Sequence, residues 1–423
     1  MHKAAYKIII LTSRFGEGHW MVTQALKEHM ERLGMQVIVV DLMAEAHPMM
    51  DAMFRFIFMQ SQTMSQYGIH YYGWSYYSTR RIERTHPLVR TGFTLGKRKL
   101  KQLLLEHRPD GIISTFPYFD VSSVVRQMNK AIPTFTVITD YDLHHRWILS
   151  TTDHYYVATV ELSEQMMRAG IAPDLVHVSG IPIRDQFDLY SQQHTMQFSM
   201  QNEEQVEALF HKYGLHSGLR TTLVMSGGLG AQAISNRFLR LLERIPNHQV
   251  VIVCGRNERW ETELKEKFRL SSNVHVFGYV SAIHELMLCA NAMVTKAGGV
   301  TLTEALAMQV PLFIARPQPG QEQENARYFA RHGAAVVVRQ DVELAMRLCE
   351  AYNQPALLES MKRSMVSLAR PYAAKRIATD ILDAITSETY PAQSSLRVSQ
   401  CLAAMVNNAT HTSSEDTANA AEN

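Results

Sequence analysis

Residues 7–20 read KIIILTSRFGEGHW, and this stretch decides the fold class. Its first six residues form a β-branched apolar run as long as one buried strand, and the glycines at positions 16 and 18 then allow a tight turn. The apolar spacing over residues 19–33 predicts a helix. A buried strand that turns at glycines into a helix is typical of a parallel sheet covered by helices on both faces.

The same unit recurs along the chain. In the first half, strands are predicted at residues 36–41, 111–115, 134–139 and 154–157, and a further helix at residues 121–130. After a polar, non-periodic stretch, strands are predicted at residues 222–225, 250–254, 274–277, 292–295, 311–315 and 334–338. We therefore expect an α/β protein of two Rossmann-like, doubly wound domains that face each other across a ligand-binding cleft.

The expected domains are residues 1–190 and residues 221–370, joined by a linker at residues 191–220. A C-terminal helix is expected at residues 371–386. Residues 387–423 are rich in Ser, Thr, Ala and Asn and show little periodicity, which predicts a disordered tail.

Composition argues against several classes of protein. The chain of 423 residues carries 42 Lys and Arg against 40 Asp and Glu, a net charge of +2, whereas a dedicated nucleic-acid binder carries a clear basic excess. The four cysteines form no CxxC pair, which argues against a disulfide framework or a zinc ribbon and favours a reducing cytoplasm. No run approaches the roughly 18–20 apolar residues of a transmembrane helix, and we expect no signal peptide.

The first glycine turn suits an anionic ligand, because free N–H groups at a helix N-terminus bind anions. Gly16, Gly18 and the acid Asp41 partly match a dinucleotide fingerprint, but Met21 replaces its third glycine, so an NAD-linked enzyme is the minority interpretation. His19 falls in the first helical turn, where the helix dipole favours a neutral imidazole that can act as a general base. A packing or capping histidine is the alternative, and the sequence leaves the two about even.

A second glycine turn follows the strand that ends at Thr295. Gly298 and Gly299 precede a helix expected to begin near Thr301, and the N-terminus of that helix suits a diphosphate. Glu304 is placed in the first turn of this helix, where a carboxylate can reach a ribose diol. The alternative is a capping box in which Thr301 caps the helix and Glu304 is its acidic partner.

Other polar groups add to this picture. Gly227 and Gly228 follow the first strand of the second half and can also cradle a phosphate. Gln321 and Glu322 lie in a loop whose amides and carboxylates suit sugar hydroxyls, which need both donors and acceptors.

The triplet Asp140-Tyr141-Asp142 looks like a metal-binding motif. Such triplets are frequent by chance, so we expect no metal here. Because the triplet follows a predicted strand on the cleft side, Asp140 is expected to line the acceptor pocket.

The most unusual segment lies between the second and third predicted strands. Residues 54–77 include nine aromatic side chains, and residues 75–101 carry eight basic residues against one acidic residue, a local charge of +7. Aromatic and basic side chains together suit the surface of an anionic bilayer, although core aromatics and a solvated helix face are the alternative. The residues expected to bind acceptor or membrane here are Trp74, Arg80, Arg81, Lys97, Arg98 and Lys99.

Together these motifs resemble a known family. The chain is similar to the glycosyltransferases of the monogalactosyldiacylglycerol-synthase type in glycosyltransferase family 28, and within them to the bacterial processive diacylglycerol β-glucosyltransferases. The stretches that carry the resemblance are GEGH at residues 16–19, residues 132–147, GIPIR at residues 180–184, and residues 295–335 with GGVTLTEALA and PGQEQENA. The resemblance extends from Lys7 to about Ile385 and departs at Ala297, where the bacterial lipid enzymes usually carry Pro.

The resemblance implies a GT-B fold, in which the C-terminal domain binds most of the donor and the N-terminal domain binds the acceptor. It implies that His19 is the general base and that Glu304 binds the donor ribose. The further residues that it implies are Gln321 and Glu322 for the donor hexose, and Gly298, Gly299 and Thr301 for the diphosphate.

The implied activity is inverting transfer of a hexose from a UDP-sugar to diacylglycerol. Glucose is the favoured hexose and galactose is the alternative. Processive repetition on the product would make a membrane glycolipid of the lipoteichoic-acid-anchor type. The resemblance also implies a peripheral protein on the cytoplasmic face of the cell membrane, with no cofactor and no tightly bound metal. Four alternatives stay open: a polyprenyl-linked acceptor, UDP-galactose as donor, an NAD-linked enzyme, and a non-catalytic partner-binding role.

Overall fold

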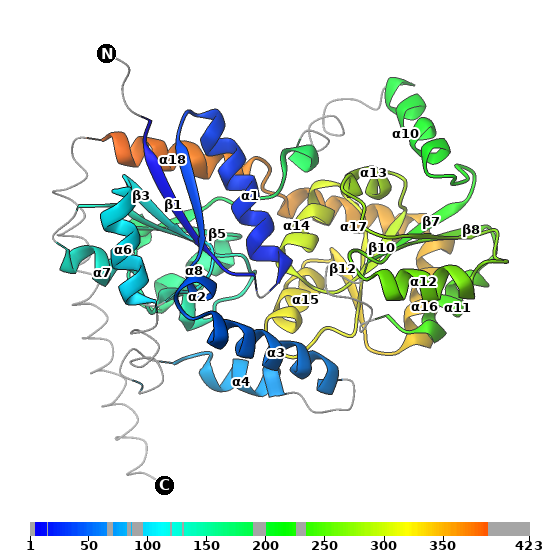
Figure 1. Ribbon diagram of the computed structural model, residues 1–423. Coiled ribbons are helices and arrows are strands. Elements are labelled where there is room, and N and C mark those ends of the chain that lie inside the picture. Colours follow the sequence, from blue (N-terminus) through cyan, green and yellow to red (C-terminus); the bar gives the residue numbers. More distant parts are fainter. Residues whose placement is uncertain are drawn as a thin grey trace, which may run out of the picture.

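Two six-stranded parallel sheets lie side by side in the computed structural model (Figure 1). The structure describes residues 5–14, 16–65, 71–82, 86, 96–118, 121–128, 131–188, 200–225 and 234–387. The N-terminal sheet has the strand order β2-β1-β3-β4-β5-β6, and the C-terminal sheet has the order β12-β11-β10-β7-β8-β9.

The strands of the N-terminal sheet are β1 (Lys7–Thr12), β2 (Gln36–Asp41), β3 (Gly111–Ser114), β4 (Thr134–Val137), β5 (His154–Val157) and β6 (Val176–Val178). Those of the C-terminal sheet are β7 (Arg220–Met225), β8 (His248–Val253), β9 (Val274–Phe277), β10 (Ala292–Thr295), β11 (Leu312–Ala315) and β12 (Ala335–Val338). The central strands are buried on both faces, as the continuous apolar runs predict.

Sixteen α-helices and two short 3₁₀ helices are described. In the N-terminal half they are α1 (Glu17–Arg32), α2 (Leu42–Ala46), α3 (Pro48–Ser65), α4 (Tyr71–Thr79), α6 (Lys97–His107), α7 (Val121–Gln127), η1 (His145–Ile148), α8 (Val160–Arg168) and η2 (Pro173–Leu175). The rest are α10 (Met200–Lys212), α11 (Asn236–Glu243), α12 (Glu258–Lys267), α13 (Ile283–Leu288), α14 (Gly299–Ala307), α15 (Gln321–Arg331), α16 (Asp341–Asn353), α17 (Pro355–Leu368) and α18 (Ala373–Thr386).

In each sheet the direction of winding reverses at the first strand of the half. β1 pairs with β2 on one side and with β3 on the other, so that Ile9 lies between Ile38 and Ile112. β7 occupies the same position between β8 and β10. Such a reversal opens a crevice at the carboxyl ends of the strands, where ligands of doubly wound sheets bind.

Most predicted strands are present within one or two residues of the expected bounds, and two local expectations need correction. The short strand β6 (Val176–Val178) is absent from the predicted set. The expected linker at residues 191–220 contains the helix α10 and the first residue of β7, although its polar composition suggested irregular structure. The expected tail lies beyond residue 387, outside the described residues.

The last helix returns to the first domain. α18 packs against α1, and its side chains Ile377 and Ile381 are fully buried in the same apolar cluster as Val22 and Leu26 of α1. The chain therefore passes between the two domains twice. Figure 1 shows α18, in orange, beside the blue elements of the N-terminal domain.

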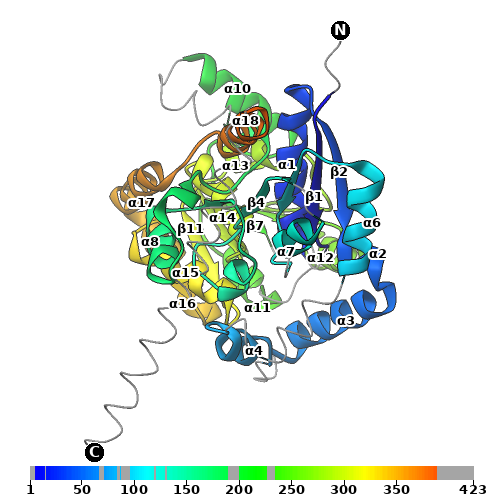
Figure 2. The same ribbon diagram turned by 90° about the vertical axis from the view of Figure 1, so that its left-hand side faces the viewer.

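Helices α3 and α4 form an arm between β2 and α6. The arm runs along the lower edge of the molecule, from the N-terminal domain towards the C-terminal one (Figures 1 and 2). Part of its surface is apolar and exposed, with Met49 86%, Phe56 63% and Trp74 68% exposed. None of the described helices is both long and apolar enough to cross a bilayer.

Candidate functional site

The N-termini of two helices meet between the domains. α1 begins after Gly16 and α14 begins after Gly298, and neither glycine offers a side chain to cap the helix. A Cβ added at Gly18 would lie 3.7 Å from Cγ2 of Val300, so the first turns of the two helices touch (Figure 1). First-turn N–H groups and two converging helix dipoles make this a favourable place for an anion.

Gly299, the second glycine of this motif, is required by the approach of the other domain. A Cβ added at Gly299 would lie 2.1 Å from the carbonyl oxygen of Thr139, closer than any side chain tolerates. Thr139, two residues beyond the end of β4 in the N-terminal domain, therefore lies directly against the start of α14. Thr295 ends β10 just before this turn and is buried.

The alternative interpretation, a capping box at Thr301, is wrong. The N-cap of α14 is Gly298, so Thr301 already lies inside the helix and Glu304 lies in its second turn. The helix can start at Gly299 because a glycine there has no side chain to clash with Thr139. Glu304 is consequently free of a capping role and available for another contact.

His19 lies in the first turn of α1, and a hydrogen bond fixes the tautomer of its ring. Its Nδ1 lies 2.8 Å from the carbonyl oxygen of Thr115, which can only accept, so Nδ1 carries the hydrogen and Nε2 has a free lone pair. Burial lowers the pKa of His19 to about 4, although the bond to Thr115 acts to raise it, and the imidazole is neutral at physiological pH. The ring packs edge-on against Phe116 and lies near Trp147.

Local hydrogen bonds hold the backbone of this turn. Thr23 Oγ1, one helical turn on, donates to the carbonyl oxygen of His19 at 2.8 Å, and the same hydroxyl lies 2.9 Å from Thr115 Oγ1. Thr139 Oγ1 lies 3.2 Å from His19 Nδ1. Because β3 and β4 are neighbours in the sheet, their carboxyl ends bring Thr115 and Thr139 to this histidine, and α1 itself supplies Thr23.

Glu304 is buried and faces an arginine of the other domain. Arg184 Nη2 lies 3.4 Å from Glu304 Oε1, and Arg184 Nη1 donates to the carbonyl oxygen of Ser281 at 2.9 Å. Burial raises the pKa of Glu304 to about 7, while Arg184 acts to lower it. Arg184 ends the GIPIR stretch, and sequence analysis did not assign it to the site because no local pattern reveals its partner 120 residues away.

Asn325 connects the domains through three hydrogen bonds of its amide. Its Oδ1 accepts from the backbone N–H of Tyr141 at 2.9 Å, and its Nδ2 donates to Asp140 Oδ1 at 3.2 Å and to the carbonyl oxygen of Ala297 at 3.1 Å. The side chain is 0% exposed. Two of these three bonds cross the domain boundary and help to hold the two domains together.

The loop before α15 places Gln321 and Glu322 at the same boundary. Glu322 pairs with Lys296 at 3.0 Å and accepts from the backbone N–H of Gln318 at 3.3 Å. Gln321 Oε1 accepts a hydrogen bond from the hydroxyl of Tyr72 at 3.3 Å. The N-cap of α15 is Gly320, a third glycine cap without a side-chain hydrogen bond.

The Asp-Tyr-Asp triplet serves the domain boundary. Asp140 is buried against Asn325, and burial raises its pKa to about 6. Asp142 forms an ion pair with Arg80 at 2.6 Å. Within the described ranges, no group of three or more His, Cys, Asp or Glu side chains is arranged to hold a metal ion.

The basic residues expected at a membrane surface have different environments. Arg80 is not an open surface cation, because it pairs with Asp142 and lies 3.9 Å from Glu324 of the C-terminal domain. Lys99 pairs with Glu45 at 3.0 Å. Those that stay exposed are Arg81 and Arg98, Lys97 is half-buried, and most of residues 83–95 lie outside the described residues.

Asp41, the acid of the dinucleotide interpretation, uses its carboxylate in structural hydrogen bonds. It caps α2 by accepting from Ala44, and it accepts from the backbone N–H of Arg14 at 3.1 Å and from Arg55 Nη2 at 3.0 Å. Arg55 of α3 also donates to the carbonyl oxygen of Arg14 at 3.0 Å. These contacts hold the arm against the loop that leads to His19 and argue against an NAD site.

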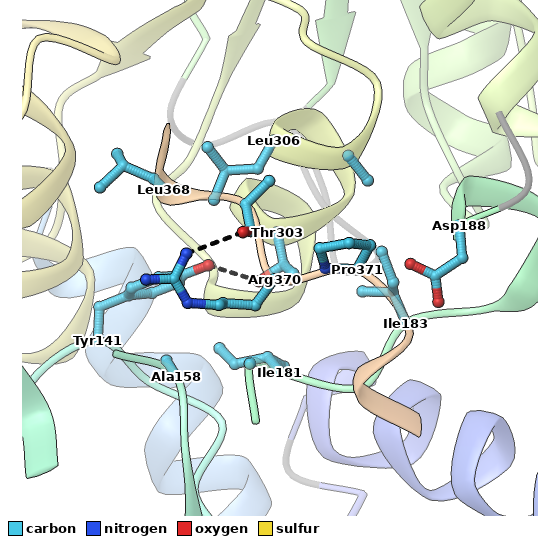
Figure 3. A pocket seen from close by; sticks show the side chains of 13 residues that line it. Tyr141, Ala158, Ile181, Ile183, Asp188, Thr303, Leu306, Leu368, Arg370 and Pro371 are labelled. Atoms are coloured by element: carbon cyan, nitrogen blue, oxygen red, sulfur yellow. Dashed lines mark hydrogen bonds between the residues drawn. The ribbon is translucent and has the colours of Figure 1, made fainter. Parts of the chain in front are cut away.

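A narrow pocket lies where the chain passes between the domains (Figure 3). Tyr141, Ile181 and Thr303 line it together with Arg370, and the hydroxyls of Tyr141 and Thr303 lie 2.8 Å apart. It has room for about one water molecule, which is far too little for a nucleotide. The expected phosphate-binding glycines Gly227 and Gly228 lie outside the described residues.

Comparison with known proteins adds to this geometry. Residues 19–183 match the model of the monogalactosyldiacylglycerol (MGDG) synthase family, and residues 221–379 match the glycosyltransferase family 28 C-terminal domain. A processive diacylglycerol beta-glucosyltransferase of Bacillus cytotoxicus is 34% identical over 387 residues, which cover 90% of this chain and 95% of the relative. The chain belongs to this glycosyltransferase family. A relative of the same name from Bacillus mycoides is 34% identical over 380 residues, 89% of this chain and 93% of the relative.

Solved structures show that the glycosyltransferase has the GT-B fold. MurG of Acinetobacter baumannii aligns with a TM-score of 0.58 at 14% identity, covering 89% of this chain and 99% of MurG. The glycosyltransferase WaaG aligns with a TM-score of 0.51 at 15% identity, covering 90% of this chain and all of WaaG. The expected fold, two Rossmann-like domains facing each other, is confirmed.

Proposed function

We propose that this glycosyltransferase moves a hexose, glucose, from UDP-glucose to the hydroxyl of diacylglycerol with inversion at the anomeric carbon. The curated relatives, which cover about nine-tenths of the chain, carry this acceptor and sugar in their names. A second transfer to the glycolipid product follows in the processive reaction. The single observation that supports the chemistry best is the fixed tautomer of His19, whose Nε2 is unprotonated where the two domains meet.

In the proposed reaction His19 Nε2 removes the proton of the acceptor hydroxyl as its oxygen bonds to the anomeric carbon. The bond from that carbon to the β-phosphate oxygen breaks on the opposite face, and UDP leaves with the electron pair. The first-turn N–H groups of α14, at Gly299, stabilise the charge that develops on the diphosphate. No metal or cofactor takes part in this proposal.

Donor binding is assigned to the C-terminal domain. The proposed contacts are Gly298, Gly299 and Thr301 with the diphosphate, Glu304 with the ribose, and Gln321 and Glu322 with the hexose. Thr295, Gly227 and Gly228 complete the proposed cradle. In the structure Arg184 forms an ion pair with Glu304. We propose that the domains separate when the donor enters, and that the ribose diol then replaces Arg184 as the partner of this carboxylate.

Acceptor binding is assigned to the N-terminal domain and to a lipid surface beneath it. Phe56, Trp74 and Tyr71 of the arm are 63%, 68% and 53% exposed, an apolar surface suited to the outer part of a bilayer. The exposed cations Arg81 and Arg98 would face anionic headgroups, each contributing roughly 1 kcal/mol. We propose a peripheral protein on the cytoplasmic face of the membrane, with Gly16, Gly18 and Asp140 at the acceptor end of the cleft.

The test is transfer of labelled sugar to lipid. Protein and vesicles containing diacylglycerol are incubated with labelled UDP-glucose or UDP-galactose, and the extracted lipids are analysed for glycosylated products. We expect glucosyl-diacylglycerol from the wild type and more than a hundred-fold loss in His19→Ala, which retains UDP binding. His107→Ala is the control, because His107 lies on α6 beside Glu106, away from the cleft.

Other outcomes would replace the proposal. Transfer to a polyprenyl-linked acceptor in preference to diacylglycerol would identify a different lipid substrate. Binding of NAD in preference to UDP would point to an oxidoreductase. Unchanged turnover in His19→Ala would remove the proposed base, and a His19 variant that kept the cellular phenotype would favour a partner-binding role.

A further inference from the structure

The arm contacts the C-terminal domain on one side and faces solvent on the other. A Cβ added at Gly73 of α4 would lie 2.4 Å from the Cβ of Pro319, so a side chain at this position would push α4 off the loop before α15. On the other side of the contact, Gly320 has a φ of 109°, and a Cβ there would lie 3.1 Å from the ring of Tyr72. Glycine on both surfaces permits this approach.

The two faces of α4 have different neighbours. Tyr71 and Trp74 are exposed, whereas Tyr72 and Tyr76 turn towards the Pro319–Gly320 turn. One further contact lies at the end of α4, where the hydroxyl of Tyr77 donates to Glu324 Oε1 at 2.7 Å. α4 therefore forms part of the wall around the start of α15, although it belongs to the acceptor domain.

The carboxamide of Gln321 is held from two sides by this domain. Its Oε1 accepts from the hydroxyl of Tyr72 at 3.3 Å, and its side chain lies near Asp140, where it acts to lower the pKa of that carboxyl. An ionised carboxylate only accepts, so the NH₂ group of Gln321 must face Asp140 and its oxygen must face Tyr72. Burial raises the pKa of Tyr72 far above its usual value, so its hydroxyl stays a donor.

A carboxamide fixed in this way has a defined set of remaining hydrogen-bonding sites. One lone pair of Oε1 and one N–H of Nε2 stay available to a ligand, each in a known direction. Glucose and galactose differ in the direction of one hydroxyl, so a fixed carboxamide distinguishes them better than one that turns freely.

We propose that Tyr72 is a positioning residue that fixes the carboxamide of Gln321 towards the donor hexose, which makes α4 of the acceptor domain a determinant of the hexose transferred. This inference rests on the proposed function, because that function makes Gln321 a contact of the hexose. Tyr72 acts through Gln321 and contacts no reacting atom.

The experiment compares two donors on one acceptor. kcat and KM are measured for UDP-glucose and UDP-galactose with the same diacylglycerol vesicles, together with the Kd of UDP and the melting temperature. In Tyr72→Phe we expect the ratio of kcat/KM for the two donors to fall about five- to ten-fold, the effect of losing about one oriented hydrogen bond. The change should lie mostly in KM, while the Kd of UDP changes less than two-fold.

A matched control separates positioning from stability. Tyr155→Phe removes another tyrosine hydroxyl, which donates to the carbonyl oxygen of Ser150 at 2.9 Å in the N-terminal domain. It should lower the melting temperature at least as much as Tyr72→Phe and leave the donor ratio unchanged. An equal fall of the donor ratio in Tyr72→Phe and Tyr155→Phe would show that the fall comes from lost stability, and it would overturn the proposal.

A second variant tests the route through Gln321. Asp140→Asn replaces an acceptor-only partner with an amide that also donates, so the Gln321 carboxamide can turn and the donor ratio should fall similarly. Because both changes act on one carboxamide, the double variant should lose little more than either single variant. Additive losses, or an unchanged ratio in Tyr72→Phe, refute the role, whereas absence of transfer by the wild type from either donor refutes the proposed function instead.

Discussion

Replacing Asn325 by alanine should open the molecule. The change removes the two hydrogen bonds that cross the domain boundary, to the backbone N–H of Tyr141 and to the carboxylate of Asp140. A neutral hydrogen bond contributes about 1 kcal/mol and one to a charged group about 2 kcal/mol, so the closed form should lose about 3 kcal/mol. That corresponds to a shift of about 150-fold in the equilibrium between closed and open forms.

The size of the effect should depend on pH. The pKa of Asp140 is about 6, raised mainly by burial, so its carboxylate is ionised at pH 8 and largely protonated at pH 5. The bond from Asn325 is to a charged acceptor at pH 8 and to a neutral one at pH 5. The cost of Asn325→Ala should therefore fall from about 3 kcal/mol at pH 8 to about 2 kcal/mol at pH 5.

Small-angle X-ray scattering measures the opening, and denaturant unfolding measures the stability. Asn273→Ala is the matched control, because the Asn273 amide donates to two backbone carbonyls within the C-terminal domain, both at 3.0 Å. It should lower stability without changing the radius of gyration. A radius of gyration in Asn325→Ala equal to that of the wild type at pH 8 would refute the assignment of the closed form to this amide.

Three further predictions follow from single positions. His19 has a pKa of about 4 and stays neutral from pH 5 to pH 8. Its titration should therefore not lower kcat in this range, and the pH profile of the residual kcat of His19→Gln should have the same shape as that of the wild type. The raised pKa of Glu304, about 7, means that the folded chain binds this proton more tightly than the unfolded chain; its stabilising contribution is present below pH 4.5 and lost as pH rises through 7. In urea titrations Glu304→Gln should therefore flatten the loss of unfolding free energy between pH 5 and pH 8, by at most about 3 kcal/mol, and a variant as pH-dependent as the wild type would contradict this. Gly299→Ala places a methyl group against the carbonyl oxygen of Thr139 and should reduce transfer at least a hundred-fold, whereas Gly218→Ala, with open space around it, should not; equal activities would disprove the close approach.

The strands could be predicted because burial on both faces leaves a strong local signal. The run at residues 292–295 is buried at all four positions and forms a strand with those bounds. The half-buried run at residues 274–277, at the edge of the sheet, also forms a strand with the predicted bounds. The strand β6 was missed because three residues, one of them His177, are too short a run to stand out. The helix α10 was missed because most of its described side chains face solvent, so that no apolar spacing marks it as a helix.

The site was harder to predict because its contacts join distant parts of the chain. The glycine turns could be found from their position after strands, and His19 from its place in the first turn of a helix. The ion pair of Arg184 with Glu304 depends on how the domains meet, and the ion pair of Arg80 with Asp142 joins residues 62 positions apart, so no local pattern encodes either pair. Counting Arg80 as a surface charge failed for this reason.

The return of α18 to the first domain affects how the protein is made. During synthesis the N-terminal half leaves the ribosome long before residues 373–386, so the apolar face of α1 that buries Ile377 and Ile381 stays uncovered until the chain is almost complete. A fragment that ends at residue 190 should expose this face and aggregate. Grafting residues 373–386 onto its end should restore a soluble, folded domain, so that the N-terminal half can be studied by itself.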